Sequence, residues 1–314
     1  MRYGYFDDAN REYVIERPDA PVSWTNYLGV RDLCTVISHN AGGYTFHKSA
    51  EHGRLTRFRP NAVPLDRPGH YVYLRDEDTG DYWTISWQPV GKDLNAVRYQ
   101  VRHGLSYSRF VCDYGDIHAE QLLFIPVDDD VEIWDVTLCN EGDRPRSLSV
   151  FSYLEWSFQH VEIDNQNLQM SLYAAGSNYG SGIIEYDFFY EPWNYHDHAA
   201  SFIPDSFDAV RDAFIGPYRT ESNPRAVERG RCSDSTELGS NHCGALHKRL
   251  VLWPGQEERL TSLLGVGSRE AAGHAARERY SDSAAVDAAF ARLRNYWQEK
   301  CGRQQICTDR KSVV

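Results

Sequence analysis

Short runs of alternating hydrophobic and polar residues, separated by turn-forming clusters, fill residues 3–265. The runs "RYGYFDD" and "REYVIER" flank residues 8–10, and "HYVYLRD" (70–76) is followed by "YWTISWQP" (82–89). Runs of this length and spacing are typical of antiparallel strands joined by tight turns. No stretch before residue 268 shows helical periodicity over a useful length, so the pattern predicts one large β domain.

The run "VEIWDVTLCN" (131–140) indicates how the strands pack. Val131 and Ile133 fall on one face of this strand, and Trp134 and Val136 fall on the other. A strand that is apolar on both faces lies between two packed layers. Further on, residues 247–266 are interpreted as a strand, a Pro-Gly turn and a returning strand. The sequence therefore predicts a mainly β protein built as a large antiparallel supersandwich.

After residue 268 the pattern becomes helical. The stretch "SREAAGHAARERYSD" is rich in Ala, Glu and Arg, and "SAAVDAAFARLRNYWQEKCG" begins with Ser283 as a candidate N-cap. Gly302 is a plausible residue just beyond the helix end. One apolar stripe runs along the second helix, and it comprises Val286, Ala289, Phe290, Leu293 and Trp297.

Two helices that follow an all-β domain need a layer to pack against. We expect them to be a linker into a further domain that covers the stripe, so that the stripe is exposed in this chain. On that interpretation, Phe290→Lys with Trp297→Lys raises the solubility of the chain without unfolding it. In the alternative, both helices fold back on the sandwich and cover it.

Composition limits the classes of partner. The formal net charge of −12 and the lack of clustered Lys and Arg argue against a nucleic-acid partner. No stretch approaches eighteen consecutive apolar residues, and the first residues carry no apolar signal core, so we expect no membrane partner. Seven scattered cysteines without a CxxC pair predict free thiols in a reducing compartment, hence a cytoplasmic protein.

Three sets of residues are candidates for chemistry. His196-Asp197-His198, with His242 and Cys243, has zinc-ligand spacing if it lies on a strand, but a solvated loop is the preferred interpretation. Residues 128–130, three consecutive aspartates, are typical of a turn rather than of a carboxylate site. Aromatic residues within the strands could stack on sugars but are interpreted mostly as core, and they include Trp83, Trp87, Trp134, Trp156 and Trp193.

Seven collinear segments resemble one enzyme family. They are "RYGYFDDANREYVIERPDAPVSWTNYLG" (2–29), "ISHNAGGYTF" (37–46), "RLTRFR" (54–59), "GHYVYLRD" (69–76), "RHGLSYS" (102–108), "FSYLEWSF" (151–158) and "AFIGPYR" (213–219). Together they resemble the cellobiose phosphorylase group, family 94 of the glycoside hydrolases. The likeness continues through the helical stretch that ends in "NYWQEK".

The resemblance implies a domain plan. Residues 1–267 correspond to an N-terminal β-supersandwich domain and 268–302 to a helical linker. Residues 303–308 begin an (α/α)6 catalytic barrel that is missing from this chain. Residues 309–314, "DRKSVV", match the translation of a sequencing-library adapter and are expected not to belong to the fold.

The resemblance also implies a reaction, the reversible phosphorolysis of a β-glucoside such as cellobiose to α-glucose 1-phosphate and a free sugar, with inversion. One carboxylic acid protonates the leaving oxygen while phosphate attacks the anomeric carbon from the opposite side. Phosphate is already anionic, so no second carboxylate is needed as a base. Family members hold the acid in the barrel, so no catalytic residue is expected here. The resemblance also implies that the reaction needs neither a cofactor nor a metal, and that inorganic phosphate is the co-substrate.

One polar segment is a candidate substrate-binding site. "HVEIDNQNLQMSLY" (160–173) resembles a loop that reaches the active site of the neighbouring subunit in a homodimer, and Asn167, Gln169 and Met170 match positions that bind substrate there. Cellobiose-specific relatives carry arginine where this chain has Met170, which argues against cellobiose itself and leaves related β-glucosides such as laminaribiose or cellobionic acid. The alternatives are an ordinary surface loop and, for the whole chain, a free-standing carbohydrate-binding module or a dimerisation domain.

Overall fold

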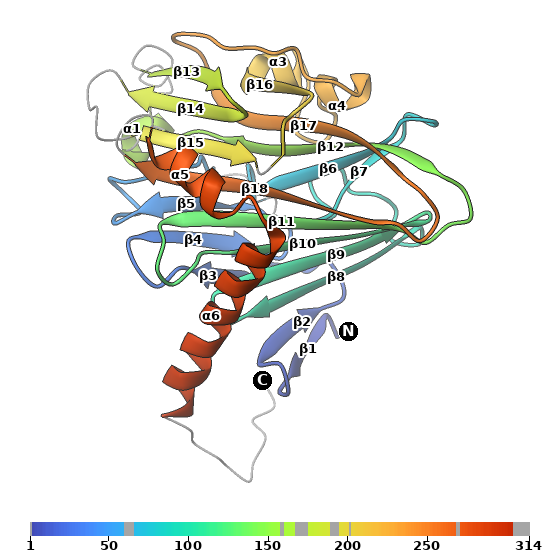
Figure 1. The fold of residues 1–314 in the computed structure, drawn as a ribbon, viewed down its shortest axis with the longest axis vertical. Helices are drawn as coiled ribbons and strands as arrows, with labels where there is room; N and C mark the ends of the chain where they lie inside the picture. The colour runs from blue at the N-terminus through green and yellow to red at the C-terminus, as the bar shows by residue number, and fades with distance from the viewer. Residues whose placement is uncertain are drawn as a thin grey trace.

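The computed structural model describes residues 2–59, 66–157, 160–166, 175–188, 195–200, 202–267 and 271–303. Within these residues the chain forms a ten-stranded sheet, a five-stranded sheet and a three-stranded sheet, all antiparallel within their ladders (Figure 1). Two longer helices follow at the C-terminal end. This architecture confirms the predicted antiparallel supersandwich followed by two helices.

The ten-stranded sheet contains both ends of the β domain. In spatial order its strands are β1 (Gly4–Asp7), β2 (Glu12–Ile15), β8 (Val97–Gly104), β9 (Tyr107–Tyr114), β10 (Ile117–Phe124), β11 (Val131–Asn140), β18 (Glu257–Gly267), β15 (Tyr195–Ala200), β14 (Ile183–Phe188) and β13 (Ala175–Gly180). The predicted first hairpin is confirmed, since Tyr5 lies opposite Val14 in the β1–β2 ladder.

In the described part of the β domain, two smaller sheets and three short helices accompany the ten-stranded sheet. The five-stranded sheet has the order β16 (Ser206–Val210), β17 (His242–Leu252), β12 (Arg146–Glu155), β6 (Tyr71–Asp76) and β7 (Tyr82–Thr84). The third sheet comprises β3 (Thr25–Leu28), β4 (Leu33–Ser38) and β5 (Gly43–His47). The short helices, none of which the sequence pattern predicted, are α1 (Val161–Gln166), α3 (Arg211–Ile215) and α4 (Arg225–Arg229).

The chain passes repeatedly from one large sheet to the other, and the connections after β11 and β17 are two examples. Strand β11 pairs with β10 and β18, whereas β12, the next strand along the chain, pairs with β17 and β6. Strands β17 and β18 are likewise in different sheets, so the Pro254-Gly255 turn is an arch between layers. The interpretation of residues 247–266 as a strand and its returning neighbour is right about the strands and wrong if taken as a paired hairpin.

The main core lies between the two large sheets. Trp134, Val136 and Leu138 of β11 are buried there, and the opposite sheet contributes Phe151 and Tyr153 of β12. The other face of β11 is buried as well, which confirms the prediction that this strand is covered on both sides. Trp83, Trp134 and Trp156 are buried core residues as expected, Trp87 is half-buried, and Trp193 lies outside the described residues.

Helices α5 (Ala271–Arg279) and α6 (Ser283–Gly302) pack on the outer face of the ten-stranded sheet (Figure 1). Val286 and Leu293 are fully buried against a cluster from β9, β10 and β11, and the Phe290 ring lies 5.0 Å from that of Tyr107 and 5.3 Å from that of Phe124. The expectation that the stripe would be exposed is therefore wrong. The apolar outer face of the sheet and the apolar stripe of the helix bury each other, and this arrangement has a lower free energy than leaving both surfaces exposed to water.

The ends of α6 also differ from the prediction. Asp282 rather than Ser283 is the N-cap, with its side chain accepting a hydrogen bond of 3.0 Å from the backbone N–H of Ala284. Gly302 is the last helical residue instead of the first residue beyond the helix. Both differences are shifts of one residue, within the ordinary ambiguity of helix ends.

The aspartate run 128–130 lies in the turn between β10 and β11 and holds the helices in place. Asp129 accepts hydrogen bonds from Arg279 and from the Tyr280 hydroxyl, while Asp130 accepts one from the backbone of Leu33. The interpretation of this run as a turn is confirmed, and each of these two carboxylates has a structural partner.

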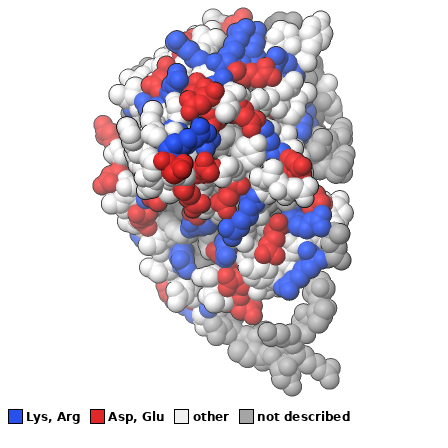
Figure 2. Space-filling view, turned by 90° about the vertical axis from the view of Figure 1, so that its right-hand side faces the viewer, with Lys and Arg blue, Asp and Glu red and all other residues white. Residues whose placement is uncertain are grey.

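The described surface mixes charges of both signs. On the face drawn in Figure 2, basic and acidic side chains are interspersed. Across the described structure the charges are not all free: Arg259 of β18, for example, bridges Asp135 of β11 and Asp287 of α6 through ion pairs. Among the described residues, no helix combines the length and the apolar character needed to cross a membrane.

Candidate functional site

The predicted substrate-binding residues Asn167, Gln169 and Met170 lie outside the described residues. Both flanks of their segment are described, α1 on one side and β13 on the other. The start of the segment is helical, since α1 spans Val161–Gln166, which corrects the expectation of a loop throughout 160–173. The site can thus be built from the residues that hold α1.

A buried ion pair fixes α1 to the β domain. Asp164, 2% exposed, accepts hydrogen bonds of 3.0 and 3.1 Å from the Nε and Nη2 atoms of Arg57, which is 3% exposed. The hydroxyl of Ser157 donates a third bond, of 3.2 Å, to the same carboxylate. Two-pronged guanidinium–carboxylate pairing fixes direction as well as distance. The six-residue helix is thereby held in one orientation just before the predicted binding residues.

A second buried carboxylate lies next to this pair. Glu155, the last residue of β12, accepts hydrogen bonds of 2.7 Å from Arg211 and 2.9 Å from the Tyr153 hydroxyl. Burial disfavours its charged form, but the positive charges of Arg211 and Arg57 outweigh burial and hold the pKa of Glu155 below its ordinary value. A carboxylate that stays ionised is unsuited to act as a general acid, so this network is structural.

The hypothetical zinc ligands His242 and Cys243 are used otherwise. Nδ1 of His242 lies 3.0 Å from the Ser177 hydroxyl, and Nε2 accepts a hydrogen bond of 3.3 Å from the backbone of Ser240. Burial lowers the pKa of His242 to about 4, so the ring is neutral. The Cys243 thiol is buried against the backbone of Asp208.

Residues 196–198 belong to strand β15, which pairs with β14 and β18, so the preferred interpretation of a solvated loop is wrong. The pattern of alternating hydrophobic residues was too weak there to indicate a strand. Among the described residues, the clusters with metal-ligand geometry lie elsewhere, and one of them comprises Glu51, His52 and His160.

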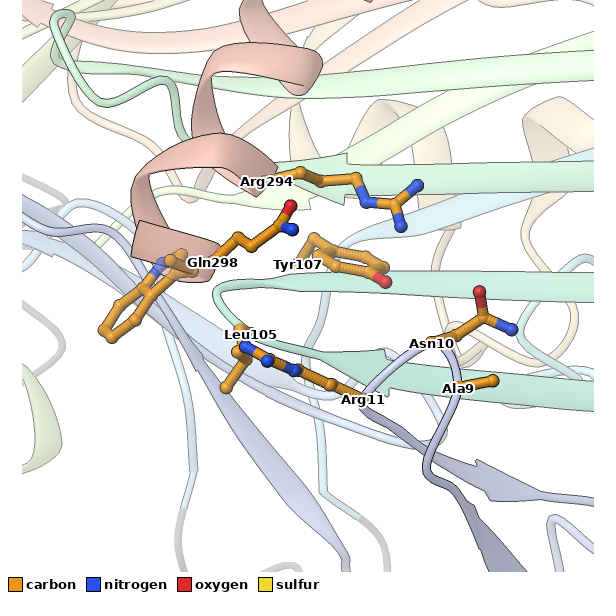
Figure 3. A pocket seen from close by; sticks show the side chains of 8 residues that line it. Ala9, Asn10, Arg11, Leu105, Tyr107, Arg294 and Gln298 are labelled. Atoms are coloured by element: carbon orange, nitrogen blue, oxygen red, sulfur yellow. The ribbon is translucent and has the colours of Figure 1, made fainter. Parts of the chain in front are cut away.

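A cavity of about 310 Å³ lies where the turn between β1 and β2 meets α6 (Figure 3). Asn10 and Arg11 approach it from the turn, Arg294 and Gln298 from the helix, and Tyr107 from β9. Cationic, amide and aromatic side chains around one hollow suit a polar ligand. Sequence reasoning missed this cavity because it exists only when α6 folds back onto the sheet beside a turn nearly 300 residues earlier.

Two facing antiparallel sheets, with a helical pair on the outer face of the larger one, define the chain as a supersandwich domain. The model of the family "Glycosyl hydrolase 94, supersandwich domain" matches residues 11–283. The chain belongs to this family. The resemblance noted in the sequence is thus confirmed.

Two relatives agree with this assignment, and a solved structure shares the fold. The chain is 56% identical over 309 residues to an N,N'-diacetylchitobiose phosphorylase from Vibrio proteolyticus and 54% identical over the same length to one from Vibrio furnissii. Each match covers 98% of this chain and 38% of the relative. A bacterial glucoamylase complexed with acarbose shares the fold, with a TM-score of 0.53 and 7% identity over 93% of this chain and 41% of that one.

Proposed function

We propose that this chain is the N-terminal part of a longer glycoside phosphorylase that splits a β-linked disaccharide with inorganic phosphate. One observation carries the proposal, the collinear match of 56% and 54% identity over 309 residues to two phosphorylases of N,N'-diacetylchitobiose. The chain spans 38% of their length, so the activity is assigned to the complete protein. A free-standing binding module is less well supported, because these relatives continue far beyond the matched region.

The substrate that we propose is N,N'-diacetylchitobiose rather than cellobiose. The two relatives with more than half of their aligned residues identical are named for it, whereas a solabiose phosphorylase from Paenibacillus borealis is only 30% identical. The departure at Met170 from the arginine expected for cellobiose supports the same choice. This proposal replaces the glucoside expectation with an N-acetylglucosaminide of the same β linkage.

The proposed reaction inverts the anomeric carbon. A carboxylic acid protonates the bridging oxygen, the bond from that oxygen to the anomeric carbon breaks, and a phosphate oxygen bonds to the carbon from the opposite side. The products are the α-anomer of N-acetylglucosamine 1-phosphate and free N-acetylglucosamine. The acid and the phosphate-holding residues are assigned to the barrel that follows in family members. We therefore expect this chain to contribute no catalytic residue and the reaction to need no cofactor, with inorganic phosphate as the co-substrate.

The supersandwich has a positioning role in this proposal. The Arg57–Asp164 pair holds α1, and α1 leads directly into Asn167, Gln169 and Met170, which we place against substrate bound by the other subunit of a homodimer. A cytoplasmic location fits the free thiols, since six of the seven cysteines lie in the described part of the chain and none of them forms a disulfide.

The test uses the complete protein and a panel of disaccharides at equal concentration. N,N'-Diacetylchitobiose, cellobiose, laminaribiose and cellobionic acid are each incubated with phosphate, and sugar 1-phosphate is measured. We expect turnover of N,N'-diacetylchitobiose at least a hundredfold faster than of the others, and none without phosphate. Faster turnover of cellobiose would contradict the substrate, and turnover independent of phosphate would contradict the reaction class.

A further inference from the structure

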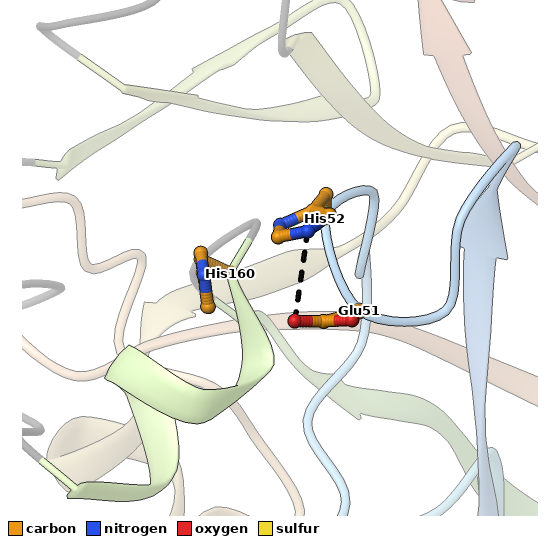
Figure 4. Close-up of side chains that lie close together, drawn as sticks. All are labelled: Glu51, His52 and His160. Atoms are coloured by element: carbon orange, nitrogen blue, oxygen red, sulfur yellow. Dashed lines mark ion pairs between the residues drawn. The ribbon is translucent and has the colours of Figure 1, made fainter.

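Two histidines and a glutamate meet at the surface beside α1 (Figure 4). Glu51 and His52 lie in the turn that follows β5, and His160 immediately precedes α1. One ligand atom of each residue lies within 4.8 Å of the other two. The two imidazole rings have centroids 4.7 Å apart, and Nε2 of His52 lies 3.5 Å from the Glu51 carboxylate.

The backbone holds these three residues in register. The N–H of Val161, next to His160, donates a hydrogen bond of 2.9 Å to the carbonyl of Glu51. In the turn, the Ser49 hydroxyl accepts hydrogen bonds from the backbone of Glu51 and His52. The side chains bring their ligand atoms together from two segments about a hundred residues apart in sequence, and only small movements remain for binding.

One ring nitrogen of this cluster is unsatisfied. Nδ1 of His160 is buried and has no hydrogen-bond partner among the described residues. Buried polar atoms are normally paired, so an orphaned one requires an explanation. If His160 binds a ligand through its ring, that bond accounts for the position in which the ring is held.

We propose that Glu51, His52 and His160 form a binding site for one divalent transition metal ion of the zinc class. Imidazole nitrogens select such ions, whereas calcium and magnesium prefer oxygen ligands. Tetrahedral zinc with bonds of about 2.1 Å places its ligand atoms about 3.4 Å apart, so the side chains must draw together by up to about 1.4 Å. The side chains of His52 and Glu51, 61% and 54% exposed, can rotate to do so.

Such an ion would join the turn after β5 to the start of α1. Asp164, one turn further along the chain, is already fixed by Arg57. The metal ion at His160 and the Arg57–Asp164 ion pair would then hold the two ends of the first turn of α1. The segment that contains Asn167, Gln169 and Met170 follows this helix. Metal binding is in this way a means of stiffening the base of that segment, and it is independent of which sugar the complete protein uses.

A second cluster, of Asp32, His47 and Asp130, provides a matched comparison. It is a weaker candidate because it offers only one nitrogen ligand, and the Lys48 ammonium lies 3.8 Å from Asp32 and competes with a cation. Its Asp130 carboxylate is also used by the backbone of Leu33. His47→Ala therefore removes a surface histidine with similar chemistry without touching the proposed site.

The test measures zinc binding by the full 314-residue chain after chelator treatment, with calorimetric titration of Zn²⁺. We expect one ion per chain in the wild type. His52→Ala and His160→Ala should each weaken binding at least tenfold, Glu51→Gln less, and His47→Ala under twofold. Melting temperatures measured with chelator present check that each variant is folded. Added Zn²⁺ should raise the melting temperature of the wild type and of His47→Ala, in which the site is intact, but not of His52→Ala or His160→Ala.

A second readout needs no variant. Zn²⁺ should protect His52 and His160 of the wild-type chain from diethylpyrocarbonate, measured residue by residue by peptide mass, while the exposed His274 of α5 stays reactive. The proposal is overturned if the wild type takes up no zinc. It is also overturned if both histidine variants bind zinc with unchanged affinity, which is the result expected if cysteine thiols bind the ion. Equal labelling of His52 and His160 with and without zinc would overturn it as well.

Discussion

Truncation of Leu293 to alanine tests whether α6 is part of the β domain. The Leu293 side chain is fully buried on the inner face of the helix, in the cluster that includes Val286 and Ala289 of α6 and Phe124 and Ile133 of the sheet. Removing a buried leucine side chain costs the lost transfer free energy plus the cost of the cavity left behind, together about 2–5 kcal/mol. Leu293 is fully buried among residues of both the helix and the sheet, so we expect a loss of at least about 2 kcal/mol.

The assay is urea unfolding of the 314-residue chain, followed both by far-ultraviolet circular dichroism and by tryptophan fluorescence. Asn295→Ala, on the exposed side of the same helix, is the matched control and should change the free energy of unfolding by less than about 0.5 kcal/mol. Both signals should move together to lower urea in Leu293→Ala. A free energy within 0.5 kcal/mol of the wild type, or loss of helical signal in a separate earlier transition, would refute the packing of α6 on the sheet.

Three further predictions concern the buried charges, pH and the activity of this chain. Asp164→Asn leaves the Arg57 guanidinium without its closest counter-charge and should cost about 3 kcal/mol in urea unfolding, whereas Asp212→Asn, on the surface, should cost under about 0.5 kcal/mol. Burial lowers the pKa values of His242 and His247 to about 4, below the 6.5 of an unfolded histidine. The unfolded state therefore binds more protons than the folded state between pH 6.5 and 4. The free energy of unfolding should fall by on the order of 2 kcal/mol per histidine from pH 7 to pH 4.5. A urea midpoint that does not change with pH would contradict this. The 314-residue chain alone should release no phosphate from α-glucose 1-phosphate or α-N-acetylglucosamine 1-phosphate with acceptor sugars present, and release above a no-protein control would mean that the active site lies in this chain.

The strands could be predicted from the sequence because alternation is a local signal. The predicted run 131–140 coincides with β11, and the hairpin of β1 and β2 forms where the turn residues indicate it. The sheet to which a strand belongs is not local information. A Pro-Gly turn can form a hairpin or an arch between sheets. Only the pairing of β17 with β12 and of β18 with β11 shows which of the two it forms.

The same limit applies to the helices and to the site. The stripe on α6 shows that something must cover it but not what, and the sheet does so through Phe124 and Val131, which the sequence presents as ordinary strand residues. Arg57 and Asp164 are 107 residues apart, and neither has a neighbour in sequence that marks it as half of a buried pair. The family resemblance indicated the segment after α1, but the residues that anchor it needed the structure.

The most direct test of the proposed function follows the phosphorus atom. The complete protein is incubated with N,N'-diacetylchitobiose and inorganic phosphate, and the products are observed by phosphorus and proton nuclear magnetic resonance. A new phosphate ester whose anomeric proton has the small coupling of an α-sugar, formed in equal amount with free N-acetylglucosamine, is the result that the proposal predicts. Two molecules of free N-acetylglucosamine with phosphate unchanged, or a β-configured ester, would contradict it.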